Sequence, residues 1–434
     1  MIQFKAWLNM VLISFFGVSF LFIYSCEESE ETQSGAQDNL LLSATFHQEY
    51  EPDVKSFIFV SDHIGNVLAD TVFNNTGDDQ FVFYIPEGFS HNKITSTVGT
   101  QLEDGSLRLE TNTNIAVGSE LHFYNPYRDE PTNSIGSSYL SLSNIPDYDS
   151  FRINTQGLPG SEPKEEESYD VLHYFENDDI LLMFTFDDGT AGYYVIENVQ
   201  VGDTNTVDLL NGAALTTAEH VEVPNNTGLP YAYRNHYGFA ATGSYIQSNI
   251  LARLISSSSI DYSNDNFVIN YPSAITQRFR FEGVVGDGWN TPGGKQFRQR
   301  TVGDIPSSIE KLDADIISFD ISDGMYSINA DGSFDQWVFE LRNVNEASET
   351  ANARWNFYNN SDSLTISKPE IPSSVLSEYP DLNQISFSLY GHVRLTDWLC
   401  ADSYGQWINL YFSSDAYYLD FCSGFRELSY WPPE

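Results

Sequence analysis

Short apolar runs recur along most of the chain after residue 40, and they have the period of β-strands. Residues 40–127 contain "LLLSATF", "SFIFVSDHIGNVLADTVF" and "QFVFYIP", which are rich in Val, Ile, Phe and Tyr. Gly, Asn and Asp separate these runs, and the spacing of apolar residues that is typical of helices is absent. The pattern predicts an all-β protein that begins with a β-sandwich over residues 40–127.

Two further β regions follow the first one. Residues 138–224 include "DILLMFTF" and "GYYVIENV", and the "DDGTAG" between them predicts a hairpin turn. Turn-rich "VPNNTGLP" then separates this region from residues 231–434. We therefore expect tandem β-sandwich domains, with a second sandwich at 138–224 and an aromatic-rich C-terminal β domain at 231–434. The pattern leaves open whether that last region is one domain or two.

Within residues 231–434 the pattern also gives local predictions. Hairpins are expected for "YSINADGSFDQWVFEL", "ISFSLYGHVRLTDW" and "QWINLYF", and a short helix for "SSIEKL" at residues 307–312.

The N-terminus has the layout of a secretory signal peptide over residues 1–25. Lys5 is the only charge before residue 26, and an almost unbroken apolar segment runs from Ala6 to Ser25. An uncleaved signal anchor remains an alternative, because about twenty apolar residues can span a bilayer as a helix.

The end of that segment, "IYSC" at residues 23–26, resembles the lipobox of bacterial lipoproteins. The acidic "EESEE" at residues 27–31 is similar to the surface-export tag of Bacteroidota lipoproteins. The resemblance implies that Cys26 is lipidated, that residues 26–39 form a linker, and that the protein is attached to the outer membrane by a lipid anchor at the cell surface.

A second resemblance concerns "VSDHIGNVLADTVF", residues 60–73. It is similar to the carboxypeptidase-regulatory-like, immunoglobulin-type domains of exported bacterial proteins, in which a strand turns through D-x-x-G-N and continues. In such proteins this domain is a spacer, and the resemblance implies no active site.

The charge of the chain excludes some partners. It carries 61 acidic and 20 basic residues, and its formal net charge is −41. This excess of negative charge argues against binding of nucleic acid by the surface as a whole. The 41% hydrophobic residues still supply enough apolar surface for folded cores.

Two cysteines remain after Cys26, namely Cys400 and Cys422. In an exported protein a pair this close in sequence predicts a disulfide bond, with two buried free thiols as the alternative.

Candidate catalytic and metal-binding motifs are weak. The eight histidines occur singly, without the spacing of a zinc site, and no G-x-S-x-G motif is present. We therefore name no catalytic residue, metal or cofactor, although a hydrolase remains an alternative. Asn329, Asp331 and Asp335 alternate as in a calcium loop, but a β-turn explains them equally well.

The stretch from residue 278 to 300 holds five of the chain's 20 basic residues, close to a glycine-rich segment. If its two ends pair as a hairpin, alternation places four guanidinium groups on one face, where they suit carboxylate or sulfate. Trp289 in the loop could stack on a sugar ring. The alternative is that these arginines pair with the chain's own acids and that Trp289 plugs the core. The candidate ligand-binding residues are Arg278, Arg280, Trp289, Lys295, Arg298 and Arg300.

The sequence thus predicts a non-enzymatic cell-surface lipoprotein that binds an extracellular ligand, with an anionic polysaccharide as the expected class. The alternative is a structural or assembly lipoprotein whose partner is an outer-membrane protein. No nucleic-acid partner is expected.

Overall fold

The computed structural model describes residues 39–432 except for fourteen gaps. The gaps are residues 48–54, 76–77, 103, 124–133, 156–167, 174–175, 240–265, 277, 287–290, 323, 345–350, 384–386, 400 and 413–423. The predicted signal peptide and Cys26 lie outside the described residues.

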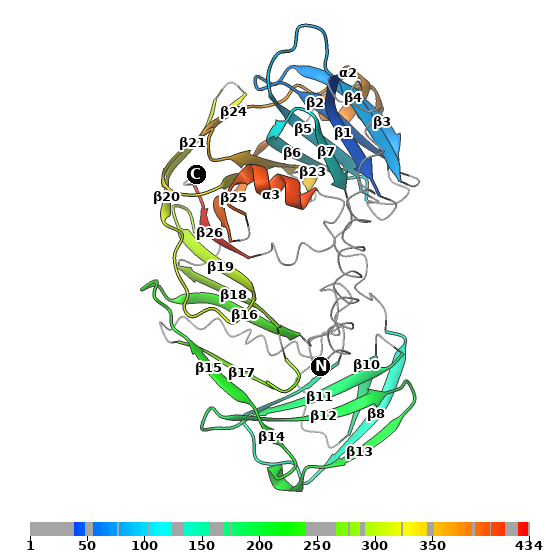
Figure 1. Ribbon diagram of the computed structural model, residues 1–434, viewed down its shortest axis with the longest axis vertical. Coiled ribbons are helices and arrows are strands. Elements are labelled where there is room, and N and C mark those ends of the chain that lie inside the picture. Colours follow the sequence, from blue (N-terminus) through cyan, green and yellow to red (C-terminus); the bar gives the residue numbers. More distant parts are fainter. Residues whose placement is uncertain are drawn as a thin grey trace, which may run out of the picture.

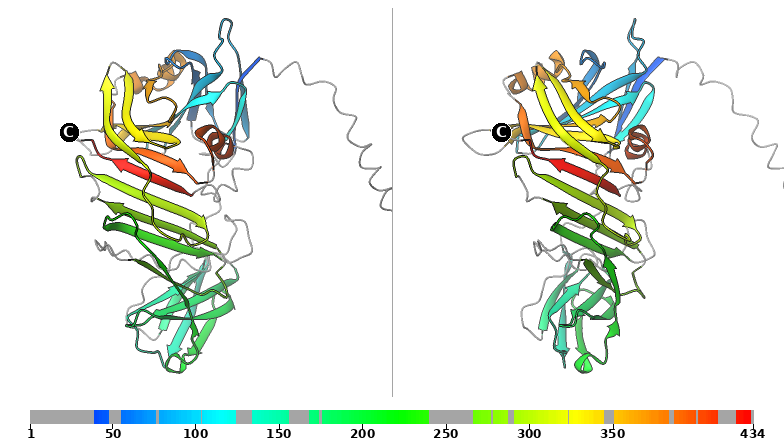
Figure 2. Two further views of the ribbon diagram at one scale, coloured as in Figure 1. Left: turned by 60° about the vertical axis from the view of Figure 1, so that its left-hand side comes forward. Right: turned by 90° about the vertical axis from the view of Figure 1, so that its left-hand side faces the viewer.

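The prediction of an all-β protein is confirmed, and a sheet of eleven strands is its central feature (Figure 1). Its strands lie roughly across the long axis of the molecule, so that the sheet extends along this axis (Figure 2). In spatial order the strands are β16 (Tyr231–Phe239), β18 (Arg278–Gly286), β19 (Lys295–Gly303), β26 (Phe425–Tyr430), β25 (Ser388–Trp398), β22 (Gln336–Val344), β23 (Ala351–Asn360), β6 (Leu107–Ala116), β5 (Lys93–Gln101), β2 (Lys55–Ser61) and β3 (Val67–Asn74).

This long sheet joins two regions that the sequence suggested were separate domains. β6 belongs to residues 40–127 and β23 to residues 231–434, and the two strands pair in parallel from Leu107–Ala353 to Asn112–Tyr358. The domain boundaries given above stay predictions. The hydrogen-bonded ladder of the long sheet, however, continues from the 40–127 region into the 231–434 region.

One face of the long sheet, called the core face here, carries the largest hydrophobic core. Alternate residues of β22 and β23 point into it, among them Trp337, Phe339, Trp355 and Phe357, all at most 1% exposed. A three-stranded sheet and a short helix cover this face. These elements are β20 (Ala314–Ser322), β21 (Met325–Gly332), β24 (Thr365–Ser367) and α2 (Ser373–Glu378).

At its N-terminal end the long sheet is buried on both faces. In β2, Phe57 and Phe59 enter the core just described, whereas Ile58 and Val60 enter a second core. The second core lies under β1 (Leu40–Phe46), β4 (Asp79–Tyr84), β7 (Ser119–Phe123) and α3 (Tyr404–Tyr411). Burial on both faces explains why "FIFV", residues 57–60, is apolar without interruption.

Residues 136–217 form two packed sheets at the other end of the molecule (Figure 1). One contains β10 (Ser168–His173), β8 (Gly136–Ser143) and β13 (Thr204–Asp208); the other contains β14 (Thr216–Thr217), β12 (Ala191–Val199), β11 (Asp178–Thr185) and β9 (Ser150–Asn154). The predicted turn between β11 and β12 is confirmed, since Phe186 N donates to Thr190 O at 2.9 Å.

A two-stranded sheet connects this sandwich to the long sheet. It consists of β15 (Glu219–Val223) and β17 (Phe267–Tyr271). Tyr271 packs against the outer apolar residues of β11 and β12, and also against the core that contains Phe281 of the long sheet. The sandwich is therefore held to the sheet by buried side chains.

Four local predictions in the C-terminal region are wrong. "QWINLYF" lies in α3, which Ser403 caps by accepting from Gln406 N, and Trp407 and Ile408 face the second core. "SSIEKL" is not helical; Ile309 forms an isolated bridge with Asn225 and fills a core. Tertiary burial decided both segments.

The two remaining errors concern hairpins. "YSINADGSFDQWVFEL" forms β21 and β22, which belong to different sheets, so the turn between them carries the chain from one layer to the next. In "ISFSLYGHVRLTDW" residues 388–398 form one strand, β25, rather than two.

Candidate functional site

The basic stretch around residues 278–300 folds as an antiparallel hairpin of β18 and β19, the condition on which the candidate site depended. Glu282 lies opposite Arg300, and Val284 lies opposite Arg298. Since opposite residues point to the same side of a sheet, Glu282, Arg298 and Arg300 share the face opposite the core face. We call this the polar face. Arg280 shares it, because it lies two residues before Glu282.

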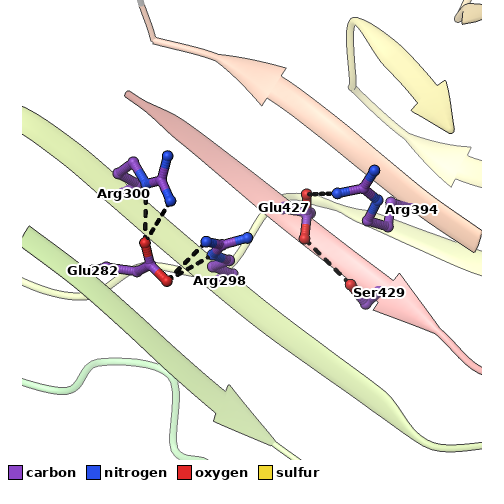
Figure 3. A network of polar contacts seen from close by, with 6 residues as sticks. All are labelled: Glu282, Arg298, Arg300, Arg394, Glu427 and Ser429. Atoms are coloured by element: carbon purple, nitrogen blue, oxygen red, sulfur yellow. Dashed lines mark hydrogen bonds and ion pairs between the residues drawn. The ribbon is translucent and has the colours of Figure 1, made fainter. Parts of the chain in front are cut away.

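One carboxylate holds two arginines on the polar face (Figure 3). Arg298 donates from Nε and Nη2 to Glu282 Oε1 at 3.0 and 2.8 Å, and Arg300 donates from the same two nitrogens to Oε2 at 3.0 and 2.7 Å. The Glu282 side chain is 11% exposed, and those of Arg298 and Arg300 are 27% and 17% exposed. The three residues form a partly buried ion cluster, as the alternative interpretation of the sequence expected.

Burial and the neighbouring opposite charges shift the pKa values of Glu282 and Arg300 in opposite directions. Burial raises the pKa of Glu282, but the two guanidinium groups outweigh it, so that the pKa lies below its ordinary value. Burial lowers the pKa of Arg300, and the neighbouring Arg280 and Arg298 lower it further, whereas Glu282 raises it. The cluster therefore depends on Glu282 for its charge balance.

An aromatic ring lies close to both guanidinium groups. Phe425 of β26 lies opposite Arg300, and its ring centroid is 5.2 Å from Cζ of Arg298 and 5.1 Å from Cζ of Arg300. Each guanidinium uses Nε and Nη2 on Glu282, so that its Nη1 edge makes no contact with that carboxylate.

The polar face continues with a second ion pair on the next two strands (Figure 3). Arg394 of β25 pairs with Glu427 of β26 at 3.4 Å, and Ser429 donates to the other oxygen of Glu427 at 3.3 Å. His392 lies near this pair and 5.0 Å from the ring of Trp431. Burial is the main cause that lowers the pKa of His392, to about 4, and Arg394 adds to it. The imidazole is therefore neutral at pH 7.

Further along the sheet, three arginines stand in line on adjacent strands. Arg342 of β22 lies opposite Arg354 of β23, and Arg354 lies beside Arg108 of β6. Arg342 pairs with Glu340, and Arg108 with Glu110 at 2.7 Å, each within its own strand. We call Arg342, Arg354 and Arg108 the arginine row.

The polar face thus gathers scarce positive charge from four distant parts of the chain. In the described part of β18, β19, β26, β25, β22, β23 and β6, arginines on this face outnumber glutamates by seven to four, although the whole chain has a net charge of −41. The arginines are Arg108, Arg280, Arg298, Arg300, Arg342, Arg354 and Arg394. The glutamates are Glu110, Glu282, Glu340 and Glu427.

Not every predicted ligand-binding residue lies in this arrangement. Lys295 points to the core face, where it pairs with Asp315 and its Nζ lies 5.8 Å from the ring of Tyr430. Arg278 belongs to β18, but its side chain lies outside the described residues, as does Trp289. The ligand-binding role of these residues stays a prediction.

The predicted disulfide also concerns residues outside the described part, since both Cys400 and Cys422 are in gaps. The strands that precede and follow them pair with each other: Trp398 lies opposite Phe425, and Leu399 N donates to Gly424 O at 3.0 Å. The disulfide stays a prediction.

The three residues considered for calcium are distributed over a strand and a turn. Asn329 and Asp331 are exposed on β21, and Asp335 accepts from Trp398 N at 2.9 Å. Burial and the neighbouring carboxylate of Asp397 raise the pKa of Asp335. Among the described residues, no group of three or more histidine, cysteine or acidic side chains has an arrangement that could hold a metal ion.

The sandwich at the far end contains a Ser–His–Asp arrangement in its interior. His173 Nδ1 lies 3.2 Å from Asp178 Oδ2, and His173 Nε2 lies 2.7 Å from Ser138 Oγ. These distances fit a catalytic triad. However, His173 and Asp178 are 0% exposed and Ser138 is 2% exposed. A substrate cannot reach this serine in the folded state, so the arrangement satisfies buried polar groups.

Comparisons with known proteins give no family for this chain. No protein family matches it, and no curated protein matches it significantly. Among solved structures, a "tetra-tandem repeat in extending region of large adhesion protein" is 10% identical, with 82% of this chain and 94% of that chain covered and a TM-score of 0.13. A "Ca2+-stabilized adhesin" of an Antarctic bacterium is 9% identical over the same shares, with a TM-score of 0.12. Likeness at this level carries no argument about function.

In the part of the chain that the structure describes, no helix is long and apolar enough to cross a membrane.

Proposed function

We propose that this chain is a non-enzymatic cell-surface lipoprotein that binds an extracellular anionic polysaccharide through the polar face of its long sheet. One observation carries the proposal: the face gathers seven arginines against four glutamates in a chain with a net charge of −41. Random placement of so few bases would spread them over the whole surface. Local positive charge in an acidic protein attracts anions that the remaining surface repels.

The fold supports a role in presentation. Hydrogen bonds between strands run along the long axis through eleven strands (Figure 2). A continuous ladder of this kind, with its core face covered, resists bending better than domains joined by flexible linkers. The sheet would hold the 136–217 sandwich at a fixed distance from the N-terminal region, where the predicted lipid anchor is attached.

The first test is binding of the chain from residue 27 onward to neutral, uronic-acid and sulfated polysaccharides. We expect binding to the charged polymers, little to the neutral ones, and weaker binding as salt rises. A wild-type protein that binds none of the charged polymers would refute the proposal.

The hairpin cluster is tested with a variant that removes its three charges together, Glu282→Leu/Arg298→Leu/Arg300→Leu. Joint replacement avoids a buried charge without a partner, which would destabilise the fold. The matched control is Lys55→Gln/Glu378→Gln, which removes an ion pair remote from the polar face. If the cluster contributes to binding, affinity falls in the triple variant and stays unchanged in the control.

A structural or assembly role is the second candidate, and a different observation favours it. Glu282 already occupies the guanidinium groups that the sequence singled out. A spacer without a polysaccharide ligand would instead contact an outer-membrane partner. Crosslinking on intact cells, followed by purification through the chain, would recover that partner at a constant ratio.

A further inference from the structure

The arginine row differs from the rest of the polar face because its charges are aligned. Arg342, Arg354 and Arg108 occupy directly neighbouring positions on three adjacent strands. Side chains at such positions start only about 5 Å apart, and like charges there repel each other. Three guanidinium groups in one line therefore cost stability unless nearby carboxylates offset the repulsion.

The two outer arginines each form a close ion pair, whereas the central one interacts with a carboxylate only at longer range. Arg342 and Arg108 each pair with a glutamate two residues away in the same strand. Arg354 is exposed and forms no ion pair within 4 Å among the described residues, although it lies near enough to the exposed Asp104 to contribute to the lowered pKa of that carboxyl. Between the two glutamates, on β23, lies the uncharged Asn356. It is opposite Glu340 of β22 and beside Glu110 of β6. The third carboxylate that would complete the pattern is therefore absent at this position of β23.

We propose that the arginine row is the primary contact for the polysaccharide, and that a sulfate or carboxylate group of the polymer takes the place of this third carboxylate on Arg354. This inference rests on the proposed function and gives it a location. The planar guanidinium of Arg354 can bind such a group through two parallel hydrogen bonds. Arg342 and Arg108 lie on either side, about 10 Å apart across the three strands.

The row fits a ligand better than the hairpin cluster does. In the cluster, one carboxylate neutralises two guanidinium groups whose side chains are 27% and 17% exposed. In the row, the side chain of Arg108 is 50% exposed and Arg354 is also exposed, whereas Arg342, at 17%, is as buried as Arg300. The two places are four strands apart, or about 19 Å, so that a long polymer lying along the sheet could reach both.

The test compares Arg354→Gln, Arg354→Lys and the control Lys93→Gln in the chain from residue 27 onward. Lys93 is an exposed base at the start of β5. The probes are dextran sulfate and polygalacturonate, measured by calorimetry at fixed salt. We expect Arg354→Gln to weaken binding at least tenfold, Arg354→Lys to weaken it less because charge remains without the planar fork, and Lys93→Gln to have no effect.

A second measurement separates a ligand site from a structural arginine. Without polymer, Arg354→Gln should melt at a higher temperature than the wild type, because it removes repulsion within the row. With dextran sulfate, the wild type should gain more in melting temperature than Arg354→Gln does. A structural role for Arg354 predicts a lower melting temperature of the variant without polymer.

The outcomes distinguish the two proposals. If wild type and Arg354→Gln bind both polymers equally, the row is not the contact, while the proposed function stands. If the wild type binds neither polymer nor any other charged polysaccharide, both proposals fail.

Discussion

Replacement of Glu282 by glutamine tests the ion cluster of the hairpin most directly. The change keeps the size of the side chain but leaves two guanidinium groups side by side without a counter-charge. Glu282 is 9% exposed and accepts four charge-assisted hydrogen bonds. Removal of one partner from a buried ion pair costs about 3–5 kcal/mol. Because Arg298 and Arg300 keep some contact with water, we expect the lower end, about 3 kcal/mol.

The assay is urea unfolding at pH 7, followed by tryptophan fluorescence. The control is Glu87→Gln, the same chemical change at an exposed loop residue, which should lie within about 0.5 kcal/mol of the wild type. If Glu282→Gln lowers the free energy of unfolding by no more than the control does, the reasoning is refuted. Such a result would mean that the cluster is solvated rather than buried.

The pH dependence of the free energy of unfolding independently checks the direction of the Glu282 pKa shift. The pKa of Glu282 lies below its ordinary value in the folded protein. Its ionised form is therefore favoured by folding, and the stability that it contributes is complete above the unfolded pKa of about 4.3 and is lost as pH falls through the folded value. The difference in unfolding free energy between wild type and Glu282→Gln should be constant from pH 7 to 5 and shrink below pH 4. A difference that grows on acidification would contradict the assignment.

Three further changes test other parts of the fold by thermal or urea unfolding. Trp355→Phe removes a buried hydrogen bond of 2.7 Å to Thr111 at the β23–β6 junction, and should cost about 1–3 kcal/mol; an unchanged midpoint would contradict a structural role of that bond. Asp335→Asn should stabilise the protein at pH 7, because a raised folded pKa means that ionisation opposes folding. The gain should vanish as pH falls well below the unfolded pKa of about 3.9, where the carboxyl is protonated in both states. His173→Leu removes the hydrogen bonds that His173 makes to the buried Asp178 and Ser138 and should cost about 1–3 kcal/mol; a melting temperature equal to the wild type would contradict a structural role of these bonds.

Much of the local structure could be predicted because burial leaves a pattern in the sequence. In "LRLETNT" the residues alternate between Leu107 or Leu109, which enter the core, and Arg108 or Glu110, which lie on the polar face. The hairpin of residues 278–300, which the sequence raised as a condition for the site, is present, since two alternating runs flank glycines.

The long sheet itself could not be predicted. Its central junction pairs β6 with β23 in parallel, and the two strands are more than 240 residues apart in sequence. Parallel pairing over such a distance leaves no turn signal between the strands. The same holds for α3, whose apolar residues fit a strand or a helix equally well until the core that they fill is known.

The candidate site shows that the charge of a sequence segment does not predict the charge of a sheet face. Within residues 278–300, the sequence argument counted five bases, and the single Glu282 between them then neutralised two. Arg108, Arg342, Arg354 and Arg394 each stand among apolar residues in segments with no excess of charge, so that no local count selects them. A sheet collects one or two residues from every strand on each face, and the excess appears only when the strand order is known. Arg354 became a candidate because its neighbours on β22 and β6 are also arginines. Arg342 lies opposite it on the same hairpin, but Arg108 comes from a strand more than 240 residues earlier, so that no single segment contains the whole row.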